Sequence, residues 1–328
     1  MYDVICIGSA TFDMFVKSAI KFSDAKPGDK VLLEHIEHSV GGGGINSSVA
    51  LLKMGLKTAF LGKLGNDEYS MMIEKELAAQ KVGIINKKKD DKLYSSYSVI
   101  LSSALENDRI VYAYKGASDN LLIKDFKLSD LKSKWIYMAT MMGESFKTCE
   151  KIAKYAKKND IKILFNPSLY LAKKGARYLK NILANTTILV LNFEEAQALT
   201  GSKTDNDVEL ARKLTKLGPK IVAITEGKKG VYAYDGHCRH SLDAFDVKVV
   251  STLGAGDAFT SGFLAGIIKT GDLSISLEMG MANAASVIQK YGARANLLTY
   301  KGALDFLHKR KEKVLKITCE LKQKDVVF

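Results

Sequence analysis

Short apolar runs alternate with longer segments of helical periodicity along much of the chain. The first run, residues 2–8, ends in Gly8 and is typical of a strand that is buried on both faces. Because strand and helix alternate, we expect a mainly parallel sheet with right-handed crossovers. The other predicted strands of this sheet lie at residues 58–61, 135–139, 161–165, 187–191, 220–225 and 231–234. The predicted helices lie at about residues 67–82, 144–158, 193–200, 273–289 and 303–310, and a further helix ends at Leu183.

Three further runs mix apolar and polar residues and favour strands outside the main sheet. They lie at residues 31–38, 94–101 and 109–114, and the last two flank a turn at residues 106–108. Together they predict a small separate sheet. A small sheet above a body of strands and helices is expected to act as a lid, which excludes water from the reaction beneath it.

One stretch, residues 251–259, predicts a tight loop that opens a helix. The small residues Gly254, Ala255 and Gly256 leave backbone N–H groups uncovered, and the helix adds a partial positive charge at its N-terminus. This combination predicts an anion site. Asp257 would repel a bound phosphate, but it is well placed to take a proton from a hydroxyl that attacks one. A plain turn before a capped helix is the alternative, and the loop alone does not decide between them.

A glycine run at residues 41–44 leads directly into an amphipathic helix. Such a run places bare backbone against a ligand, and the amide of Asn46 offers both a donor and an acceptor to neighbouring hydroxyls. A flexible linker seldom runs directly into so apolar a helix. We therefore favour a site for a polyhydroxylated substrate.

Polar residues follow several predicted strands, where ligands of open parallel sheets bind. Asp13 comes a few residues after the first strand, and Asn166 and Asn192 come directly after later ones. Asp13 could equally be a surface loop residue, and Asn192 could also cap the helix that follows it. Lys115 ends the last lid strand, where it could meet a phosphate or an acidic substrate or simply face solvent.

The charge balance suits anionic ligands. The chain has 49 Lys and Arg against 36 Asp and Glu, a net charge of +13. The basic residues form small groups at helix ends and in turns without interleaved aromatic residues, so we predict a solvated surface and no nucleic-acid partner. No apolar stretch approaches the roughly 20 residues of a membrane span, and the N-terminus enters a strand without a leader pattern, so we expect a cytoplasmic protein without a membrane contact.

The four cysteines are far apart and form no Cys-x-x-Cys pair, so neither disulfides nor zinc sites are expected. They are Cys6, Cys149, Cys238 and Cys319. A turn at Asp235 and Gly236 predicts that His237, Cys238 and His240 are exposed loop residues and not metal ligands.

Taken together, these stretches resemble the ribokinase-like (PfkB) family of carbohydrate and nucleoside kinases, in order and spacing from about residue 3 to about residue 310. The glycine run with Asn46 resembles the N-terminal signature of the family, and residues 252–257 resemble its C-terminal signature. Asn192 and Glu195 match the family's Asn-x-x-Glu element. Its nucleotide-binding turn resembles Thr225, Gly227 and Gly230.

The resemblance implies a three-layer αβα body with a mainly parallel sheet and a small β lid. It implies one domain over residues 1–328, with lid strands inserted at about residues 14–38 and 93–115. The catalytic roles it implies are a general base, Asp257, and an anion hole, Gly254, Ala255 and Gly256. Substrate hydroxyls would be bound by Asp13, Gly42, Gly43, Asn46, Lys115 and Asn166. ATP would be bound by Asn192, Glu195, Thr225, Gly227, Gly230 and Asn283, with Glu195 also organising Mg²⁺ through water.

Two positions depart from the family pattern. The family commonly has Asp where this chain has Ser251, and that Asp contributes to the ion site of members activated by a monovalent cation, so K⁺ activation is in doubt. Ribokinases usually have Lys within the glycine run, where this chain has Gly43, so the resemblance does not imply ribose.

The expected function is an ATP- and Mg²⁺-dependent kinase of a sugar hydroxyl. A nucleoside kinase of the same family is the main alternative, because four lid tyrosines could face a base, although they form no clear platform. They are Tyr94, Tyr97, Tyr112 and Tyr114. A second alternative is a catalytically idle sugar- or nucleotide-binding regulator. Exposed lid edges also predict a homodimer formed through the lid.

Overall fold

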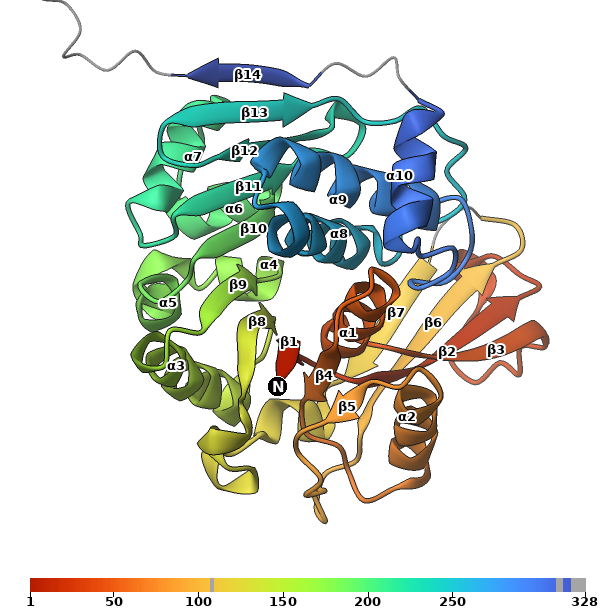
Figure 1. Cartoon of the computed structure of the whole chain (residues 1–328). Helices are drawn as coiled ribbons and strands as arrows, with labels where there is room; N and C mark the ends of the chain where they lie inside the picture. Colours follow the sequence, from red (N-terminus) through yellow and green to blue (C-terminus); the bar gives the residue numbers. More distant parts are fainter. Residues whose placement is uncertain (107–108, 311–314, 320–328) are drawn as a thin grey trace, which may run out of the picture.

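The computed structural model describes residues 1–106, 109–310 and 315–319, and its main feature is one ten-stranded sheet (Figure 1). The strand order is β14-β13-β12-β11-β10-β9-β8-β1-β4-β5. Strands from β5 to β11 pair in parallel, and β12, β13 and β14 add antiparallel pairs at one edge. The bounds are β1 Tyr2–Ile7, β4 Thr58–Leu61, β5 Gly83–Ile84, β8 Ser133–Ala139, β9 Lys162–Asn166, β10 Ile188–Asn192, β11 Ile221–Thr225, β12 Val231–Tyr234, β13 Cys238–Leu242 and β14 Lys316–Cys319.

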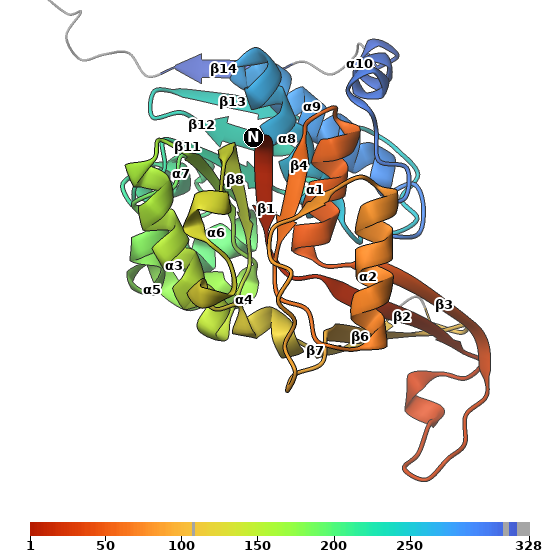
Figure 2. The same ribbon diagram turned by 60° about the horizontal axis from the view of Figure 1, so that its bottom comes forward.

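Helices cover both faces of the sheet (Figures 1 and 2). One face packs against α3 Gly143–Lys158, α5 Gly175–Leu183, α6 Phe193–Thr200 and α7 Asp207–Thr215. The other packs against α1 Gly43–Lys53, α8 Ala255–Thr270, α9 Leu273–Val287 and α10 Tyr300–His308. The central strands are buried on both sides, as the apolar run at residues 4–7 predicts, since each of those residues is 0% exposed. The predicted αβα body with a mainly parallel sheet is confirmed.

The lid is a second sheet of four strands in the order β3-β2-β6-β7, which extends away from the body (Figure 2). Its strands are β2 Thr11–Ser18, β3 Leu33–Gly41, β6 Ser96–Ser103 and β7 Arg109–Tyr114. The outer pairs are antiparallel, and the central pair β2 and β6 is parallel. The predicted lid is therefore confirmed, and Asp13, for which a surface loop was one of the two alternatives, lies in strand β2. Helix α2, Glu68–Ala79, packs beside the lid.

Two predictions about the cysteines are wrong. Cys238 and His240 belong to strand β13 and not to an exposed loop, because β13 pairs with β12 on one side and β14 on the other. Cys238 and Cys319 face each other across β13 and β14 and form a disulfide. His237 does lie in the turn before β13. Helix α7 was not predicted from the sequence.

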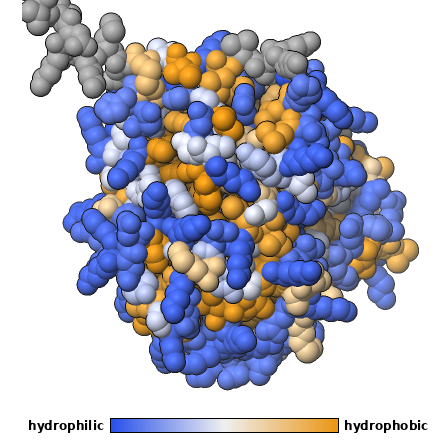
Figure 3. All heavy atoms as spheres, in the orientation of Figure 1, coloured by the Kyte–Doolittle hydropathy of each residue, from blue (hydrophilic) through white to orange (hydrophobic). Residues whose placement is uncertain are grey.

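Lysines are spread more widely than the sequence groups indicate. Lys151 and Lys154 lie in the middle of α3, on its exposed side, and not at a helix end. Figure 3 shows that hydrophilic residues cover most of the surface over α3 and α5. The surface over these helices is therefore mainly hydrophilic.

Candidate active site

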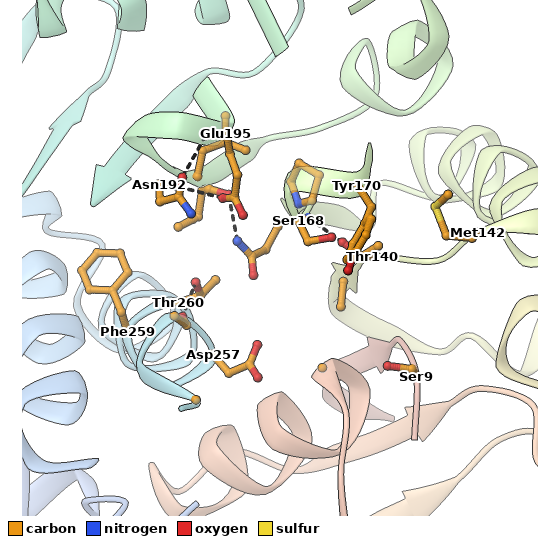
Figure 4. Close-up of a pocket in the computed structure, with 18 of the residues that line it drawn as sticks. Ser9, Thr140, Met142, Ser168, Tyr170, Asn192, Glu195, Asp257, Phe259 and Thr260 are labelled. Atoms are coloured by element: carbon orange, nitrogen blue, oxygen red, sulfur yellow. Dashed lines mark hydrogen bonds between the residues drawn. The ribbon is translucent and has the colours of Figure 1, made fainter. Parts of the chain in front are cut away.

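A cavity of about 670 Å³ lies where the carboxyl ends of β8, β9, β10 and β11 meet the N-terminus of α8 and the lid. Figure 4 shows several of the side chains that line it. The carboxyl ends of parallel strands are where open α/β sheets bind ligands. Nine of the residues predicted for the site line this cavity: Gly43, Lys115, Asn166, Asn192, Glu195, Thr225, Gly254, Gly256 and Asp257.

The predicted anion loop forms the N-terminus of α8. Gly254 caps the helix with a left-handed backbone, φ 77°, and Ala255 is its first residue. A β-carbon at Gly254 would lie 2.6 Å from Cα of Ala293, so the loop also packs closely against the chain after α9. Because the 16-residue helix starts at the cavity, its partial positive charge is directed at any anion bound there.

The carboxylate of Asp257 lies in the first turn of α8 and faces the cavity (Figure 4). The side-chain amide of Asn46, on α1, donates to Asp257 Oδ2 at 2.9 Å. Burial raises the pKa of Asp257 to about 6, and the Asn46 hydrogen bond opposes this shift. The other amide atom, Asn46 Oδ1, is buried and has no partner among the described residues. The Asp257 carboxylate therefore offers a proton acceptor, and Asn46 Oδ1 beside it is a hydrogen-bond acceptor without a partner among the described residues.

Asn192 and Glu195 cap α6 reciprocally at the opposite wall. The Asn192 side chain accepts from the N–H of Glu195 at 2.8 Å, and Glu195 Oε2 accepts from the N–H of Asn192 at 2.8 Å. Figure 4 shows both side chains at the cavity. Burial raises the pKa of Glu195, and backbone hydrogen bonds from Asn192 and Leu169 oppose the shift. The predicted cap is confirmed, and it leaves Asn192 at the cavity wall.

The carboxylates present fit a magnesium ion held mainly by phosphates and water. No group of three or more His, Cys, Asp or Glu side chains that could hold a metal occurs among residues 1–106, 109–310 and 315–319. Mg²⁺ typically keeps several waters and takes one or two protein carboxylates together with substrate phosphates. Glu195 provides one such carboxylate at the cavity wall.

Asp13 lies on the lid strand β2, and its carboxylate lies against Gly41. A β-carbon at Gly41 would clash with Asp13 Oδ2. Ser98 Oγ, on β6, donates to Asp13 Oδ1. Burial raises the pKa of Asp13, and the positive charges of Lys115 and Arg294 oppose the shift. Lys115 lines the cavity together with Asp119, in the 3₁₀ turn that follows β7.

The remaining predicted residues are not among those that line the cavity. Gly42 precedes α1 at the root of the lid, and Gly227 and Gly230 lie in the turn between β11 and β12. Asn283 is 0% exposed on α9, where its amide donates to the carbonyl of Ala258 and accepts from the N–H of Leu298. As positioned here, the Asn283 side chain cannot contact a nucleotide, because its polar atoms are used within the protein core.

A model of the pfkB family of carbohydrate kinases matches residues 1–299 of the chain. The chain belongs to the pfkB family. Kinases of this family are ATP-dependent phosphotransferases with an alcohol group as acceptor, and the predicted family and enzyme class are therefore confirmed.

Relatives of this pfkB kinase act on different acceptors, as their names indicate. It is 27% identical to 5-dehydro-2-deoxygluconokinase of Clostridium perfringens over 328 aligned positions, which cover 95% of this chain and 94% of that one. The solved structure of Arabidopsis thaliana ribokinase with ribose and ATP superposes with a TM-score of 0.82 at 21% identity, covering 93% and 98%. Methanocaldococcus jannaschii nucleoside kinase superposes with a TM-score of 0.77 at 21% identity, covering 94% and 99%.

Sequence reasoning missed several side chains that line the cavity of this pfkB kinase. Ser9 follows β1, Thr140 follows β8, and Ser168 follows β9 by two residues. Their position just after a predicted strand is a signal that could have identified them. Asp119, Met142 and Tyr170 also line the cavity, but no pattern in the sequence distinguishes them. No helix among the described residues is long and apolar enough to cross a membrane.

Proposed function

We propose that this pfkB kinase transfers the γ-phosphoryl group of ATP to a hydroxyl of a small sugar, with Asp257 as the general base. The observation that supports this most is the Asp257 carboxylate in the first turn of α8. It combines a pKa near 6 with the anion-binding end of a helix in one cavity. A base with such a pKa is ionised at neutral pH and still accepts a proton readily.

In the proposed reaction, the acceptor hydroxyl gives its proton to Asp257 while its oxygen attacks the γ-phosphorus. The bond from that phosphorus to the bridging oxygen breaks, and ADP leaves with the bonding electron pair. The backbone N–H groups at residues 254–256 stabilise the negative charge on the oxygens of the transferred group. Asn46 fixes the direction of the Asp257 carboxylate, and its free Oδ1 accepts from an acceptor hydroxyl. Asp13, Gly42 and Gly43 complete the acceptor site.

At the nucleotide end, we assign the ATP phosphates to Asn192, Thr225 and the glycines 227 and 230. Glu195 would hold Mg²⁺ through water, and bound Mg²⁺ offsets the negative charge of the phosphates. Asn283 is left out of this assignment, because its side chain is buried and fully hydrogen-bonded.

The lid register favours a sugar over a nucleoside. Ala113 lines the cavity. Tyr112 and Tyr114 are its neighbours on β7, so their side chains project from the opposite face of the lid. Tyr97 pairs with Tyr114 and shares that outer face. Among residues 11–18, 33–41, 96–103 and 109–114, Phe15 is the one Phe, Tyr or Trp on the cavity face. These strands therefore offer little surface for stacking a base.

The experiment that tests the function measures ADP release with MgATP and single acceptors. The panel contains ribose, 5-dehydro-2-deoxygluconate, fructose 6-phosphate, inosine and adenosine, each with and without K⁺. A strong signal with a sugar and no stimulation by K⁺ is expected, because Ser251 replaces the Asp that the family commonly has. A nucleoside as the best acceptor would move the assignment to the nucleoside kinases. No transfer to any acceptor despite ATP binding would favour the idle regulator.

Asp257→Asn tests the assigned base. Its kcat should fall by about 10²- to 10⁴-fold, the usual contribution of a general base, while ATP binding is retained. Asp305→Asn, on the exposed side of α10, is the matched control and should keep full activity. Full activity of Asp257→Asn would reject the assignment.

We further propose that two copies pair through their lids. The outer lid face exposes Ile36 at 51%, Tyr112 at 62% and Tyr114 at 47% of their surface, and β3 and β7 are free lid edges. Light scattering of the eluted protein should then give about twice the chain mass of 36.0 kDa. Tyr112→Lys should lower that mass to the monomer value, and a monomeric wild type would reject the proposal.

A further inference from the structure

Two consecutive residues after α9, Ala293 and Arg294, contact both parts of the proposed site from outside the cavity. Ala293 packs against Gly254, the residue that caps α8 at the anion loop. The guanidinium of Arg294 extends to the lid, where Nη2 donates to the carbonyl oxygen of Val40 at 2.6 Å. Its Nη1 pairs with Glu76 Oε1, on α2, at 2.8 Å. One short segment therefore joins the anion loop to the root of the lid.

Val40 lies at the root of the lid, next to residues that contact the proposed acceptor site. A shift of Val40 would therefore also move the acceptor site. Val40 precedes Gly41, which lies directly against the Asp13 carboxylate. Two residues further on, the carbonyl of Gly42 accepts the N–H of Asn46 at 2.9 Å, and Asn46 in turn holds Asp257. The Val40 carbonyl is thus linked through a few covalent and hydrogen bonds to both the proposed acceptor ligand and the proposed base.

The chemistry of these contacts requires arginine. The guanidinium serves a carbonyl on β3 and a carboxylate on α2 with two separate N–H groups in a fixed fork, and lysine has no such fork. The Arg294 side chain is 17% exposed and the Glu76 side chain 32%, so both are partly shielded from water. The same positive charge also acts on the Asp13 carboxylate.

We propose that Arg294 is a positioning residue of the kinase reaction, which holds the root of the lid in register with the anion loop. The acceptor, bound by Asp13, and the phosphoryl group, bound at residues 254–256, then meet at Asp257. The inference rests on the proposed function, because Asp13 must bind the acceptor for the lid root to affect catalysis.

Steady-state kinetics separate positioning from simple packing. The variants are Arg294→Ala and Arg294→Lys, with Glu76→Gln as a control that keeps a hydrogen-bond acceptor for Nη1. With MgATP and the panel acceptor of highest kcat/KM, Arg294→Ala should raise the acceptor KM and lower kcat, each by about 10-fold or more. Arg294→Lys should lie between wild type and Arg294→Ala. The KM for ATP should stay within about twofold in all three, and Glu76→Gln should retain near wild-type kinetics.

Hydrogen exchange of the full chain without any ligand tests the same inference independently of the acceptor. In Arg294→Ala, exchange should accelerate in peptides from residues 33–48 and from residues 250–258. Glu76→Gln should leave both peptides at the wild-type rate. A purely structural role would confine the change to residues 286–298, α2 and the segment around Val40, and would leave residues 250–258 at the wild-type rate.

The inference is overturned if a folded Arg294→Ala or Arg294→Lys variant keeps the wild-type acceptor KM, kcat and lid exchange. Asp13→Asn is measured in parallel, because it separates this failure from failure of the proposed function. If Asp13→Asn leaves the acceptor KM unchanged, the proposed acceptor site is wrong and the inference fails with it. If Asp13→Asn raises that KM and Arg294→Ala does not, only the role of Arg294 is wrong.

Discussion

Two opposing requirements act on the carboxylate of Asp257, the proposed base. A base must accept a proton readily, which burial favours by raising its pKa to about 6. It must also be ionised and directed at the acceptor, which the amide of Asn46 favours at 2.9 Å. The balance leaves a carboxylate that is mostly charged at neutral pH and yet more basic than an exposed aspartate.

The first consequence is a pH profile. The proposed mechanism requires the ionised form of Asp257, so kcat/KM should rise with pH through about 6 and level off above about 7. The profile is measured with saturating MgATP in buffers of constant ionic strength. The control variant Asp305→Asn should give the same pH profile as the wild type. An acid limb near the ordinary aspartate value of about 4 would show that the base is not a buried carboxylate.

The second consequence concerns stability. A carboxyl group whose pKa is raised by folding favours the native state below its unfolded pKa, near 4, and loses that contribution as pH rises through about 6. Asp257→Asn removes the cost of the buried charge. It should therefore raise the free energy of unfolding by about 1–3 kcal/mol at pH 8, and by little at pH 4. Urea denaturation at both pH values measures the difference, and a variant less stable than wild type at pH 8 would contradict the prediction.

Residues that line the cavity were predictable where one local motif contains them. Asp257, with its glycines, and Glu195, with its capping partner, are examples, because each motif fits within a few residues. Asp119 and Met142 were not predictable, because tertiary folding alone brings them to the cavity. Asn283 was predicted for the site, but its amide is bonded within the core. The sequence indicates the type of a residue but not whether its side chain faces a ligand or the core.

At the scale of elements, the N-terminus of α8 depends on one residue that can adopt a left-handed backbone. Gly254 has φ 77°, and a β-carbon there would lie 2.6 Å from Cα of Ala293. Gly254→Ala should lower both kcat and stability, because the loop must move away from Ala293. Gly271→Ala, at the other end of the same helix, is the matched control, since φ is 70° but nothing lies within 4 Å of the added carbon.

The glycine control separates backbone strain from crowding. Gly271→Ala should cost about 1 kcal/mol of stability from the left-handed backbone alone and leave kcat unchanged. Gly254→Ala should lose clearly more stability, and its kcat should fall by at least about 10-fold as the anion loop shifts. Equal effects on unfolding and no loss of kcat in Gly254→Ala would show that the close approach to Ala293 does not position the loop.

The body strands were predictable because burial on both faces leaves an uninterrupted apolar run. The lid was expected to begin at about residue 14, and the start of strand β2 at Thr11 was not recognised, because the polar Asp13 lies within it and pairing across the lid determines its conformation. Strand β13 carries Arg239 and His240, and its extended form depends on its two neighbours. The outward direction of the lid tyrosines likewise follows from the pairing register and not from their positions in the chain.

At the scale of the whole molecule, the disulfide between Cys238 and Cys319 closes a loop of chain with a sequence separation of 81. Such a link restricts the unfolded chain, so the oxidised protein should be about 2–4 kcal/mol more stable than the reduced one. Urea denaturation with and without dithiothreitol measures this. Cys319→Ser should have the same stability as the reduced wild type, and dithiothreitol should not change it. Kinase activity should not change, because the disulfide lies at the β14 edge and away from the cavity. Equal stability of the oxidised wild type, the reduced wild type and Cys319→Ser would contradict the prediction.

Alternation of strand and helix was enough to predict the class of fold. The features that unite distant parts of the chain were beyond sequence reasoning. The contact of Arg294 with Val40 spans a sequence separation of 254, and the cysteine pair spans 81. Spacing rules compare neighbours in the sequence, and neither pair is close enough for such a rule to detect it.

Strand β14 is the edge strand of the main sheet, and with four residues it is shorter than β13, which has five. It covers the backbone N–H and C=O groups along the edge of β13, and without it these groups would be a template for strands of other molecules. The Cys238–Cys319 disulfide keeps this cover in place. A reduced sample should consequently aggregate on storage while its folded molecules are still fully active, and oxidising storage buffers should preserve it as a clear solution.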